Sequence, residues 1–437
     1  MGITLKPVRV GICGFGTVGG GTFNVLQRNC EEITRRTGRA IVVEHIAQRR
    51  PNVNCDTGNT AITDDIFAVA NNPDVDVLVE LIGGHEPAKE LVLTAIRNGK
   101  HVVTANKALI AEHGNEIFEA AHKYNVVVAY EAAIAGGIPI VKALREGLAA
   151  NSINWLAGII NGTGNFILTE MRDKGRAFAD VLKEAQELGY AESDPTFDVE
   201  GIDAAHKLTI LSSVAFGIPL QFEQCYTEGI SKVSAEDVAN AESLGYRIKH
   251  LGLTRRTEAG IELRVHPTLI PEKRLIANVH GVMNAVLVEG NAVGPTMYYG
   301  AGAGADPTAS SIVADLVDVV RDMAVDQNVR MPSLAFQQDA MSDSPILSMD
   351  NVVTAFYMRM AVSDKPGVLA QITQILGNAG ISIEAIRQQT HVSSQVPVII
   401  LTRPVLEGHM NDAIKAIEAL ADVNGEVTRI RVENLDG

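Results

Sequence analysis

Three glycines follow directly on a β-branched segment near the start of this 437-residue chain. Val8–Cys13 reads as a buried strand, and Gly14, Gly16 and Gly19 succeed it at the point where a helical pattern begins. Glycines at this spacing allow a tight turn and let a helix pack closely against the strand before it. We therefore predict an α/β fold built on an open parallel sheet.

The rest of the first third of the chain repeats this alternation of strand and helix. Long apolar runs are typical of strands in a parallel sheet that helices cover on both faces. Such runs occur at Ile41–Ala47, Val75–Ile82, Val102–Thr104 and Val126–Tyr130, with helical patterns at Phe23–Thr34 and Glu90–Asn98. We predict a Rossmann-type domain over residues 1–135, completed by residues from about 300 to 330.

Beyond residue 135 the pattern changes to longer helices, and we predict an α+β domain over residues 136–300. Its helical patterns span Ala177–Leu188 and Gly201–Phe216, and its strand patterns span Ile261–Val265 and Ala285–Glu289. Residues 331–351 lack an apolar period and form the predicted linker. Residues 352–432 follow as strand, helix, two strands, helix and strand, which predicts a separate small α+β domain.

The composition argues against several partners. Lys and Arg number 37 against 52 Asp and Glu, which gives a net charge of −15 at pH 7. Nucleic acids and anionic membranes need a basic face, so we expect neither as a partner. No window approaches 18 uninterrupted apolar residues, and the four cysteines show no metal-ligand spacing. Scattered thiols, and an N-terminal segment without a signal-peptide pattern, lead us to expect a cytoplasmic protein.

The glycine turn and the strand ends near it predict a dinucleotide site. In Rossmann-type domains the pyrophosphate lies on the N-terminal N–H groups of the first helix. We therefore assign cofactor contacts to the residues of this turn, which are Gly14, Phe15, Gly16, Thr17, Val18 and Gly19. Ligands of open α/β sheets bind beyond the carboxyl ends of the strands, so Gly83, Thr104 and Lys107 should lie toward the nicotinamide.

The tip of the second predicted strand bears on the choice between NAD and NADP. An acidic residue there would bind the ribose 2′-hydroxyl of NAD, whereas arginine would accept the 2′-phosphate of NADP. The chain has Gln48, Arg49 and Arg50 at this tip and no carboxylate. We expect NADP(H) to be preferred, with NAD(H) as a second cofactor; alternatively, both arginines are solvated loop residues.

Residues 185–207 gather several carboxylates ahead of a helix that carries Asp203 and Lys207. These two residues are four apart and share a helix face with Ile210 and Val214, so the lysine heads an apolar stripe. Hydride transfer to a carbonyl also needs a proton for the oxygen, and a partly desolvated lysine near a second lysine can deliver it. Carboxylates nearby would bind an ammonium group, which predicts an amino-acid substrate bearing an alcohol or aldehyde.

The same segment resembles the signature of the homoserine dehydrogenases. The matching positions are Ala185, Gly189, Tyr190, Ala191, Asp194, Pro195, Asp198, Val199, Gly201, Asp203 and Lys207. Other similar stretches are TANK at 104–107, AAIAGGIP at 132–139, INGTGNFIL at 160–168 and GAG at 302–304, and the resemblance spans residues 8–325. Two positions depart from the usual pattern: Gly164 replaces an expected threonine, and Arg50 stands where many relatives are acidic.

The resemblance implies a reaction and roles for the residues of this segment. The reaction is the interconversion of L-aspartate 4-semialdehyde and L-homoserine with NADP(H), in threonine, methionine and isoleucine biosynthesis. Lys207 would be the general acid/base, with Lys107 assisting at the junction of cofactor and substrate. The residues implied to contact the substrate are Glu192, Asp203, Asp198 and Gly189. Among them Glu192 and Asp203 would bind the amino group, and Asp198 would orient the lysine.

The resemblance also implies contacts from glycine-rich loops. Gly304, in the GAG stretch, would contact the cofactor. A monovalent cation, Na⁺ or K⁺, would be held by the main-chain oxygens of Glu131, Ile134, Gly136 and Ile138. Backbone carbonyls of such a loop could equally bind water, so the physical argument leaves both options open.

Residues 352–432 resemble the ACT domain, a βαββαβ module that binds amino acids where two copies pair. The similar positions are Asp364-Lys-Pro-Gly367, between the first strand and helix, and the Gly380-Ile-Ser-Ile stretch that follows. The resemblance implies feedback control by L-threonine; alternatively, the module only dimerises the enzyme. We expect a homodimer or homotetramer.

Two other functions compete with this interpretation. A semialdehyde dehydrogenase of the same fold class would need a cysteine nucleophile, and the one cysteine outside the nucleotide half is Cys225. A non-catalytic amino-acid sensor would combine an inert Rossmann-type domain with an ACT domain. The pair of Lys107 and Lys207 argues against the sensor.

Overall fold

The computed structural model of the chain describes residues 6–388 and 395–436 and contains two compact units. Unit 1 comprises Met1–Gly162, Asp203–Gln224 and Val282–Ser344, and unit 2 comprises Thr163–Ile202, Cys225–Gly281 and Pro345–Gly437. Residues 1–5 of the predicted first domain and 389–394 of the predicted last domain lie outside the described residues. Within the described ranges, no helix is both long enough and apolar enough to cross a membrane.

The main sheet of unit 1 is parallel and leads into the glycine turn. Its strand order is β3-β2-β1-β4-β5-β6, the order of a doubly wound Rossmann-type domain. The strands are β1 Val8–Cys13, β2 Ile41–Ala47, β3 Ala61–Thr63, β4 Val77–Glu80, β5 His101–Thr104 and β6 Val128–Ala129. The central strands β4 and β5 are buried at every position, as expected where helices cover both faces. The predicted α/β fold class is confirmed.

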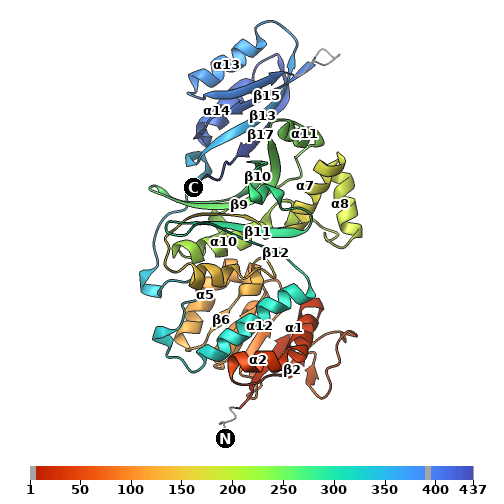
Figure 1. Ribbon diagram of the computed structural model, residues 1–437, viewed down its shortest axis with the longest axis vertical. Coiled ribbons are helices and arrows are strands. Elements are labelled where there is room, and N and C mark those ends of the chain that lie inside the picture. The colour runs from red at the N-terminus through yellow and green to blue at the C-terminus, as the bar shows by residue number, and fades with distance from the viewer. Residues whose placement is uncertain (1–5, 389–394, 437) are drawn as a thin grey trace. The chain divides into compact units, whose positions relative to one another are not determined.

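Helices cover this sheet, and one of them returns from late in the sequence. They are α1 Thr17–Arg28, α2 Cys30–Thr37, α3 Ile66–Asn71, α4 Ala88–Arg97, α5 Lys107–Lys123 and α12 Ala305–Asp322. The teal helix α12 packs against the red helix α1 in Figure 1. Gly21 permits this contact, because a Cβ atom there would lie 2.7 Å from the backbone oxygen of Ala305.

Several bounds predicted for this domain differ from the structure, and two of the differences have a visible cause. The helix predicted over Phe23–Thr34 is interrupted at Asn29, whose φ of −110° and ψ of 15° separate α1 from α2. The strand predicted over Val75–Ile82 is limited to Val77–Glu80. It ends there because the Glu80 carboxylate accepts the N–H group of Ile82 at 2.8 Å, which turns the backbone away from the sheet.

Unit 1 also contains three antiparallel strands in the order β12-β11-β7 and a buried helix, α10. The ranges of these elements, and of the short helix α6, are Ile140–Lys142 (α6), Ile153–Ile159 (β7), Ile202–Phe216 (α10), Met283–Gly290 (β11) and Gly294–Ala301 (β12). Apolar residues occur on most sides of α10, which is typical of a helix enclosed by its domain. Asp203 and His206 are nevertheless buried in it, so both side chains need polar partners inside the unit.

Unit 2 is built on a long antiparallel hairpin of β9, Tyr246–Thr257, and β10, Gly260–Pro271. The strand β10 also pairs in parallel with the short β8, Tyr226–Thr227. The helices of this part are α7 Gly162–Lys174, α8 Phe178–Glu187, α9 Thr196–Val199 and α11 Ala235–Ser243. The helix predicted over Ala177–Leu188 is therefore present as α8, one residue shorter at each end.

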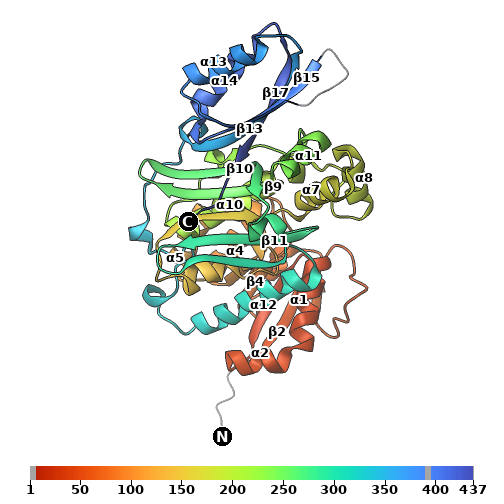
Figure 2. The same cartoon turned by 45° about the horizontal axis from the view of Figure 1, so that its top comes forward.

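The predicted βαββαβ module ends unit 2. Its elements are β13 Val353–Ser363, α13 Val368–Asn378, β14 Ile383–Gln388, β15 Gln395–Thr402, β16 Val405–Leu406, α14 Glu407–Glu418 and β17 Val423–Val432, and the sheet order is β17-β13-β15-β14. Successive residues of β13 point to opposite faces. Phe356 and Met358 pack with α13 and α14, which lie side by side in Figure 2. Tyr357 joins a cluster with apolar residues of α7 and α11.

Candidate active site

The glycine turn joins β1 to α1 with the geometry that a pyrophosphate needs. Gly14 has a φ of 96°, and a Cβ atom there would lie 2.5 Å from the oxygen of Leu81. A Cβ atom at Gly19 would lie 2.3 Å from the oxygen of Gly14, whereas one at Gly16 would meet nothing within 4 Å. The turn is therefore tightly packed at Gly14 and Gly19 and open at Gly16, where the first N–H groups of α1 begin.

The other residues of the turn differ in what they can offer a cofactor. Phe15 is 4% exposed and packs edge-to-face on Phe23, so its side chain belongs to the core and only its backbone can serve a ligand. Thr17 is exposed at the first position of α1, and Val18 is half-buried beside it.

Arg49 and Arg50 are exposed in the turn that follows β2. The side chain of Asn52 ties this loop to the glycine turn by donating to the oxygens of Phe15 (3.2 Å) and Gly16 (3.0 Å). Both guanidinium groups therefore belong to a loop that is anchored at the open glycine. The sequence analysis missed Asn52, since no local pattern distinguishes it from an ordinary loop asparagine.

A buried carboxylate joins the ends of β4 and β5. Glu80 is 0% exposed and accepts hydrogen bonds from the N–H groups of Ile82 (2.8 Å) and Gly83 (3.1 Å) and from the hydroxyl of Thr104 (2.6 Å). Burial raises the pKa of Glu80, and these hydrogen bonds oppose the rise. Thr104 is also 0% exposed, so its hydroxyl supports the strand ends, while Gly83 is exposed at the turn with a φ of 73°.

Asn106 sets the start of α5 and thereby the position of Lys107. Its Oδ1 atom accepts the N–H group of Leu109 at 3.1 Å, which caps the helix. Its Nδ2 atom donates to the oxygen of Gly84 at 2.7 Å, which fixes the helix start to the turn after β4. Lys107 is the first residue of this helix, and its side chain is 32% exposed.

Asp203 brings the two predicted catalytic lysines to one carboxylate. Lys107 Nζ lies 3.0 Å from Asp203 Oδ1, and Lys207 Nζ lies 2.6 Å from Asp203 Oδ2. Lys207 Nζ also donates to the oxygen of Ile160 (2.7 Å), and Asn161 Nδ2 donates to Asp203 Oδ2 (2.9 Å). Burial by itself would raise the pKa of Asp203, but the two ammonium groups and the amide hold it well below its usual range. The carboxylate is therefore ionised and shared.

The cluster of Asp203, Lys107 and Lys207 holds a lysine ammonium group in one position, from which it can donate a proton. An ammonium group beside an ionised carboxylate is held in one orientation, and a second ammonium group nearby favours release of its proton. Asp203 and the oxygen of Ile160 are two groups within unit 1 that orient Lys207. The orienting role assigned to Asp198, and the contact of Asp203 with a substrate amino group, remain predictions.

The other predicted substrate residues lie in unit 2, around the loop that follows α8. Gly189 has a φ of 73° and donates its N–H group to the oxygen of Gln186, which ends the helix. Gln186 Nε2 holds the loop by donating to the backbone oxygen of Glu192 at 3.1 Å. Glu192 is exposed, and Asp198 is half-buried in α9.

The loop predicted to hold a monovalent cation is buried and contains two left-handed residues in succession. Ala135 and Gly136 each have a φ of 51°, and Ser311 Oγ donates to the oxygen of Gly136 at 2.6 Å. A carbonyl oxygen has two lone pairs, so such a hydrogen bond leaves capacity for a hard cation. The carbonyls in question belong to Glu131, Ile134, Gly136 and Ile138. Carbonyl oxygens are ligands of the kind that a hard cation such as Na⁺ or K⁺ accepts. The Glu131 carboxylate is engaged separately, because it caps the start of α6 with two contacts of 2.8 Å.

Gly304 lies directly before α12, with a φ of 127°. Its oxygen accepts the N–H group of Thr308 at 3.1 Å, which begins the helix. The next residue, Ala305, approaches Gly21 of α1 closely. The fold therefore brings Gly304 to the helix that starts at the glycine turn, although the two are far apart in sequence.

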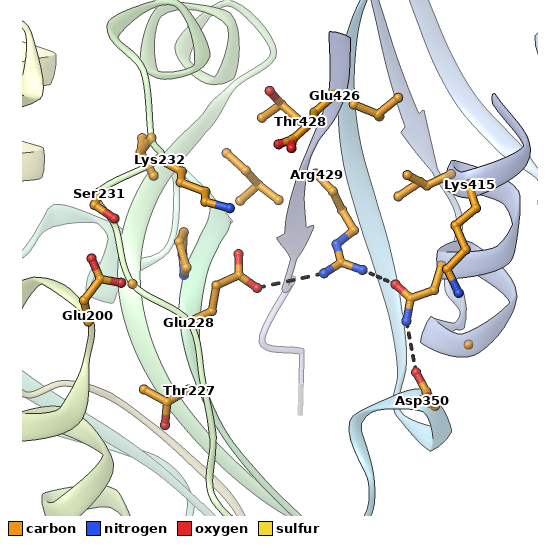
Figure 3. Close-up of a pocket in the computed structure, with 18 of the residues that line it drawn as sticks. Glu200, Thr227, Glu228, Ser231, Lys232, Asp350, Lys415, Glu426, Thr428 and Arg429 are labelled. Atoms are coloured by element: carbon orange, nitrogen blue, oxygen red, sulfur yellow. Dashed lines mark hydrogen bonds and ion pairs between the residues drawn. The ribbon is translucent and has the colours of Figure 1, made fainter. Parts of the chain in front are cut away.

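Unit 2 also contains a polar hollow of about 1270 Å³ between the βαββαβ module and residues 227–233. Arg429 of β17 reaches across it, and Figure 3 shows its guanidinium group directed toward Glu228. Arg429 also donates a hydrogen bond to Oδ1 of Asn411. Lys232, Lys415 and Glu426 add charges of both signs to the lining. Side chains of both signs suit a small zwitterion better than an apolar ligand.

A parallel sheet with an open glycine turn, and a lysine–carboxylate cluster next to its strand ends, define an NAD(P)-linked oxidoreductase. Comparison with known families makes this assignment specific. Residues 14–131 match the family described as homoserine dehydrogenase, NAD binding domain; residues 139–317 match homoserine dehydrogenase; and residues 357–432 match the ACT domain. The chain belongs to the homoserine dehydrogenase family.

Full-length relatives agree with this assignment. The chain is 68% identical over 434 residues to a homoserine dehydrogenase of Pseudomonas aeruginosa, which covers 99% of this chain and 100% of the relative. The crystal structure of a homoserine dehydrogenase from Thiobacillus denitrificans matches with a TM-score of 0.95 and 63% identity, over 99% of this chain and 100% of that one. A hyperthermophilic archaeal homoserine dehydrogenase in complex with NADPH matches with a TM-score of 0.61 and 26% identity, over 72% of this chain and 98% of that one.

Membership of this family settles the class of reaction. The chain is an oxidoreductase of amino-acid biosynthesis that interconverts L-aspartate 4-semialdehyde and L-homoserine with a nicotinamide cofactor. The semialdehyde dehydrogenase and the non-catalytic sensor are thereby excluded.

Proposed function

We propose that Lys207 is the general acid/base of this reaction and that Lys107 assists it. A bound nicotinamide supplies or accepts the hydride. In the reducing direction Lys207 Nζ donates a proton to the aldehyde oxygen, and in the oxidising direction it takes the proton of the homoserine hydroxyl. The observation that carries this proposal is the carboxylate of Asp203, which holds both lysine Nζ atoms within 3.0 Å of its oxygens.

The substrate amino group is proposed to bind carboxylates. By the family resemblance these are Glu192 and Asp203, with Asp198 orienting the lysine and Gly189 shaping the loop. The exposure of Glu192 and the half-buried position of Asp198 support a role in ligand contact, because neither carboxylate is enclosed in the core.

NADP(H) is proposed as the preferred cofactor and NAD(H) as a second one. The support is the exposed pair Arg49 and Arg50 on a loop tied to Gly16 by Asn52. A guanidinium group can hold a 2′-phosphate by charge-assisted hydrogen bonds, which NAD does not offer. A relative has been solved in complex with NADPH, so binding of this cofactor has a precedent in the family.

A monovalent cation in the loop 131–138 is proposed on the donor set described above. Occupied by Na⁺ or K⁺, the carbonyls would stiffen the two left-handed residues Ala135 and Gly136. Activity measured in Tris-buffered KCl, NaCl and choline chloride at equal ionic strength tests this, since choline is too large for the loop. Equal activity in all three salts would contradict it.

The regulatory and assembly proposals concern the ACT module and strand β12. L-threonine is proposed as the amino acid that the module binds, and steady-state kinetics with and without it provide the test. A homodimer or homotetramer is proposed because β12 is an edge strand of its sheet and carries Tyr299, a large side chain that is 58% exposed. If threonine changes neither kinetics nor assembly, the module serves dimerisation only.

The compartment and the domain limits are proposals of the same kind. A cytoplasmic location is proposed on the four cysteines, which are scattered along the sequence and show no disulfide or metal-ligand spacing. The proposed domains are residues 1–135 with about 300–330 for the cofactor, 136–300 for substrate and dimerisation, 331–351 as linker and 352–432 for regulation. The family matches over residues 14–131 and 357–432 support the first and last of these ranges, whereas the match over residues 139–317 extends past the proposed limit at residue 300.

The decisive experiment replaces Lys207 by Ala in the full-length enzyme. We expect kcat to fall about 10²–10⁴-fold, since a positioned proton donor is lost. Binding of NADPH, followed by its fluorescence, should stay within threefold of wild type, because the lysine serves the substrate. Lys183→Ala, which removes a lysine whose side chain is 78% exposed, should leave both unchanged. A Lys207→Ala variant with kcat within threefold of wild type would contradict the proposal.

A further inference from the structure

We propose that His85, Glu112 and His113 of unit 1 form a binding site for a divalent transition-metal ion such as Zn²⁺. One ligand atom of each residue, an imidazole nitrogen or a carboxylate oxygen, lies within 4.8 Å of the other two. His85 Nε2 is 3.6 Å from Glu112 Oε1, and the rings of His85 and His113 meet edge-to-face with centroids 5.7 Å apart. Across residues 6–388 and 395–436, no other three His, Cys, Asp or Glu side chains converge in this way.

Two neighbouring segments present these side chains. His85 follows the left-handed residues Gly83 and Gly84 after β4, whereas Glu112 and His113 are consecutive in α5. Asn106 fixes the two segments to one another by its hydrogen bond of 2.7 Å to the oxygen of Gly84. The backbone positions of all three donors are thus set before any ion binds.

The donor set indicates the class of ion. Two imidazole nitrogens and one carboxylate oxygen are ligands that Zn²⁺ and its neighbours accept, whereas Mg²⁺ and Ca²⁺ prefer oxygen donors. Zn–N bonds of about 2.0–2.1 Å place tetrahedral ligand atoms about 3.4 Å apart. The side chains of His85 and Glu112 are 45% and 32% exposed, so they can rotate to this spacing without a change in the backbone.

A buried histidine orients the carboxylate of this site. His206 Nε2 lies 2.9 Å from Glu112 Oε1, and because a carboxylate only accepts, the imidazole donates. His206 is 2% exposed, and its ring stacks on Phe222 with centroids 4.2 Å apart, which locks its orientation. Metal-binding carboxylates are commonly held by such a second hydrogen bond.

The test is a titration of the full-length enzyme with Zn²⁺, measured by calorimetry. Wild type should bind one ion per chain at this site, and His85→Ala combined with His113→Ala should weaken that binding at least 100-fold. His122→Ala, which removes an exposed histidine elsewhere in α5, should bind as wild type does.

Co²⁺ provides a second readout that separates this site from the cysteines. It should give visible absorption bands of a nitrogen–oxygen site without a thiolate charge-transfer band. Equal Zn²⁺ affinity of wild type and the double variant, no binding by wild type, or a thiolate band would each overturn the proposal.

Discussion

The ionised carboxylate of Asp203 serves two lysines, and its removal tests whether the cluster is catalytic. Asp203→Asn should lower kcat by about 10²-fold or more, because Lys207 loses the group that orients its proton. The free energy of unfolding should fall by up to about 3–5 kcal/mol, since two ammonium groups lose a buried partner. Steady-state kinetics and urea unfolding measure the two effects, and Asp180→Asn on the exposed side of α8 is the control.

The pH dependence of that stability loss follows from the depressed pKa of Asp203. A carboxylate whose pKa is lower in the folded state stabilises the fold fully above its unfolded pKa of about 3.9. The contribution is lost as pH falls toward the folded value. The difference between wild type and Asp203→Asn should therefore be constant between pH 6 and 8 and shrink below pH 4. A difference that grows on acidification would contradict this assignment.

Cofactor choice is a second question at the level of single residues. Replacing Arg49 and Arg50 together by Ala should narrow the ratio of kcat/KM for NADP over NAD by at least tenfold, since about 1.4 kcal/mol is a factor of ten. The lost groups would bind only the 2′-phosphate. The paired control replaces the exposed Arg35 and Arg36 of α2, which contact Glu32 instead. An unchanged ratio in the first variant would mean that both arginines are solvated.

The sequence predicts some residues of the site better than others for a physical reason. Lys107, Lys207 and the glycines have local signatures, because each depends on its place at a strand end or on a helix face. Glu80 and Asn52 lack such a signature, since each forms a hydrogen bond with a residue more than twenty positions away: Glu80 with Thr104 and Asn52 with Phe15. One signal could have identified Glu80: it is the single Glu within the otherwise largely apolar range Val75–Ile82.

Among the elements, the glycine turn allows a prediction that separates binding from folding. Gly16→Ala should fold with an unchanged Tm, because its Cβ atom would meet nothing within 4 Å, yet raise the KM for NADPH by filling the cradle. Gly19→Ala should lower Tm by several degrees, because its Cβ atom would lie 2.3 Å from the oxygen of Gly14. Thermal unfolding and cofactor titration of both variants give the comparison. Equal losses of Tm would refute the distinction.

Some predicted elements match the structure at both ends, and others cover only part of the observed element. Val8–Cys13 and Ile41–Ala47 were predicted with their observed ends. By contrast, Ile261–Val265 is only part of β10, Gly260–Pro271. The predicted range stops at Val265, before His266 and Pro267. Arg264, inside that range, is buried because it has carboxylate partners, one of which, Glu433 at 2.6 Å, comes from far along the chain. A single sequence does not reveal such compensation.

At the largest scale the ACT module is continuous with the rest of unit 2. The sequence predicts a separate small domain, because its strands and helices follow a complete βαββαβ pattern. In the structure β17 pairs with β13 on one side and in parallel with β10 on the other. Tyr357 also packs among residues of α7 and α11. The module therefore shares both a sheet and an apolar core with its unit.

Arg431 lies in β17, the strand that joins the ACT module to β10. Its replacement tests whether the module and the rest of unit 2 unfold together. It is 0% exposed, donates to Glu407 of α14 at 2.8 Å, and donates to Glu228 after β8 at 2.8 Å. Arg431→Met removes the guanidinium group that donates two hydrogen bonds to Glu407, itself 2% exposed, and leaves Arg429 at 3.4 Å as a longer partner. We expect this loss to cost about 3–5 kcal/mol. Arg403→Met, at an exposed position, is the control.

Hydrogen exchange followed by mass spectrometry measures the result. We consider the backbone amides of β10 and β13 that exchange only when the whole unit opens. In Arg431→Met both sets should exchange at least 100-fold faster than in wild type, since about 1.4 kcal/mol is a factor of ten. The two strands should respond together because β17 is hydrogen-bonded to each of them. Faster exchange confined to β13, with β10 unchanged, would show that the module opens by itself and that the shared sheet does not couple them.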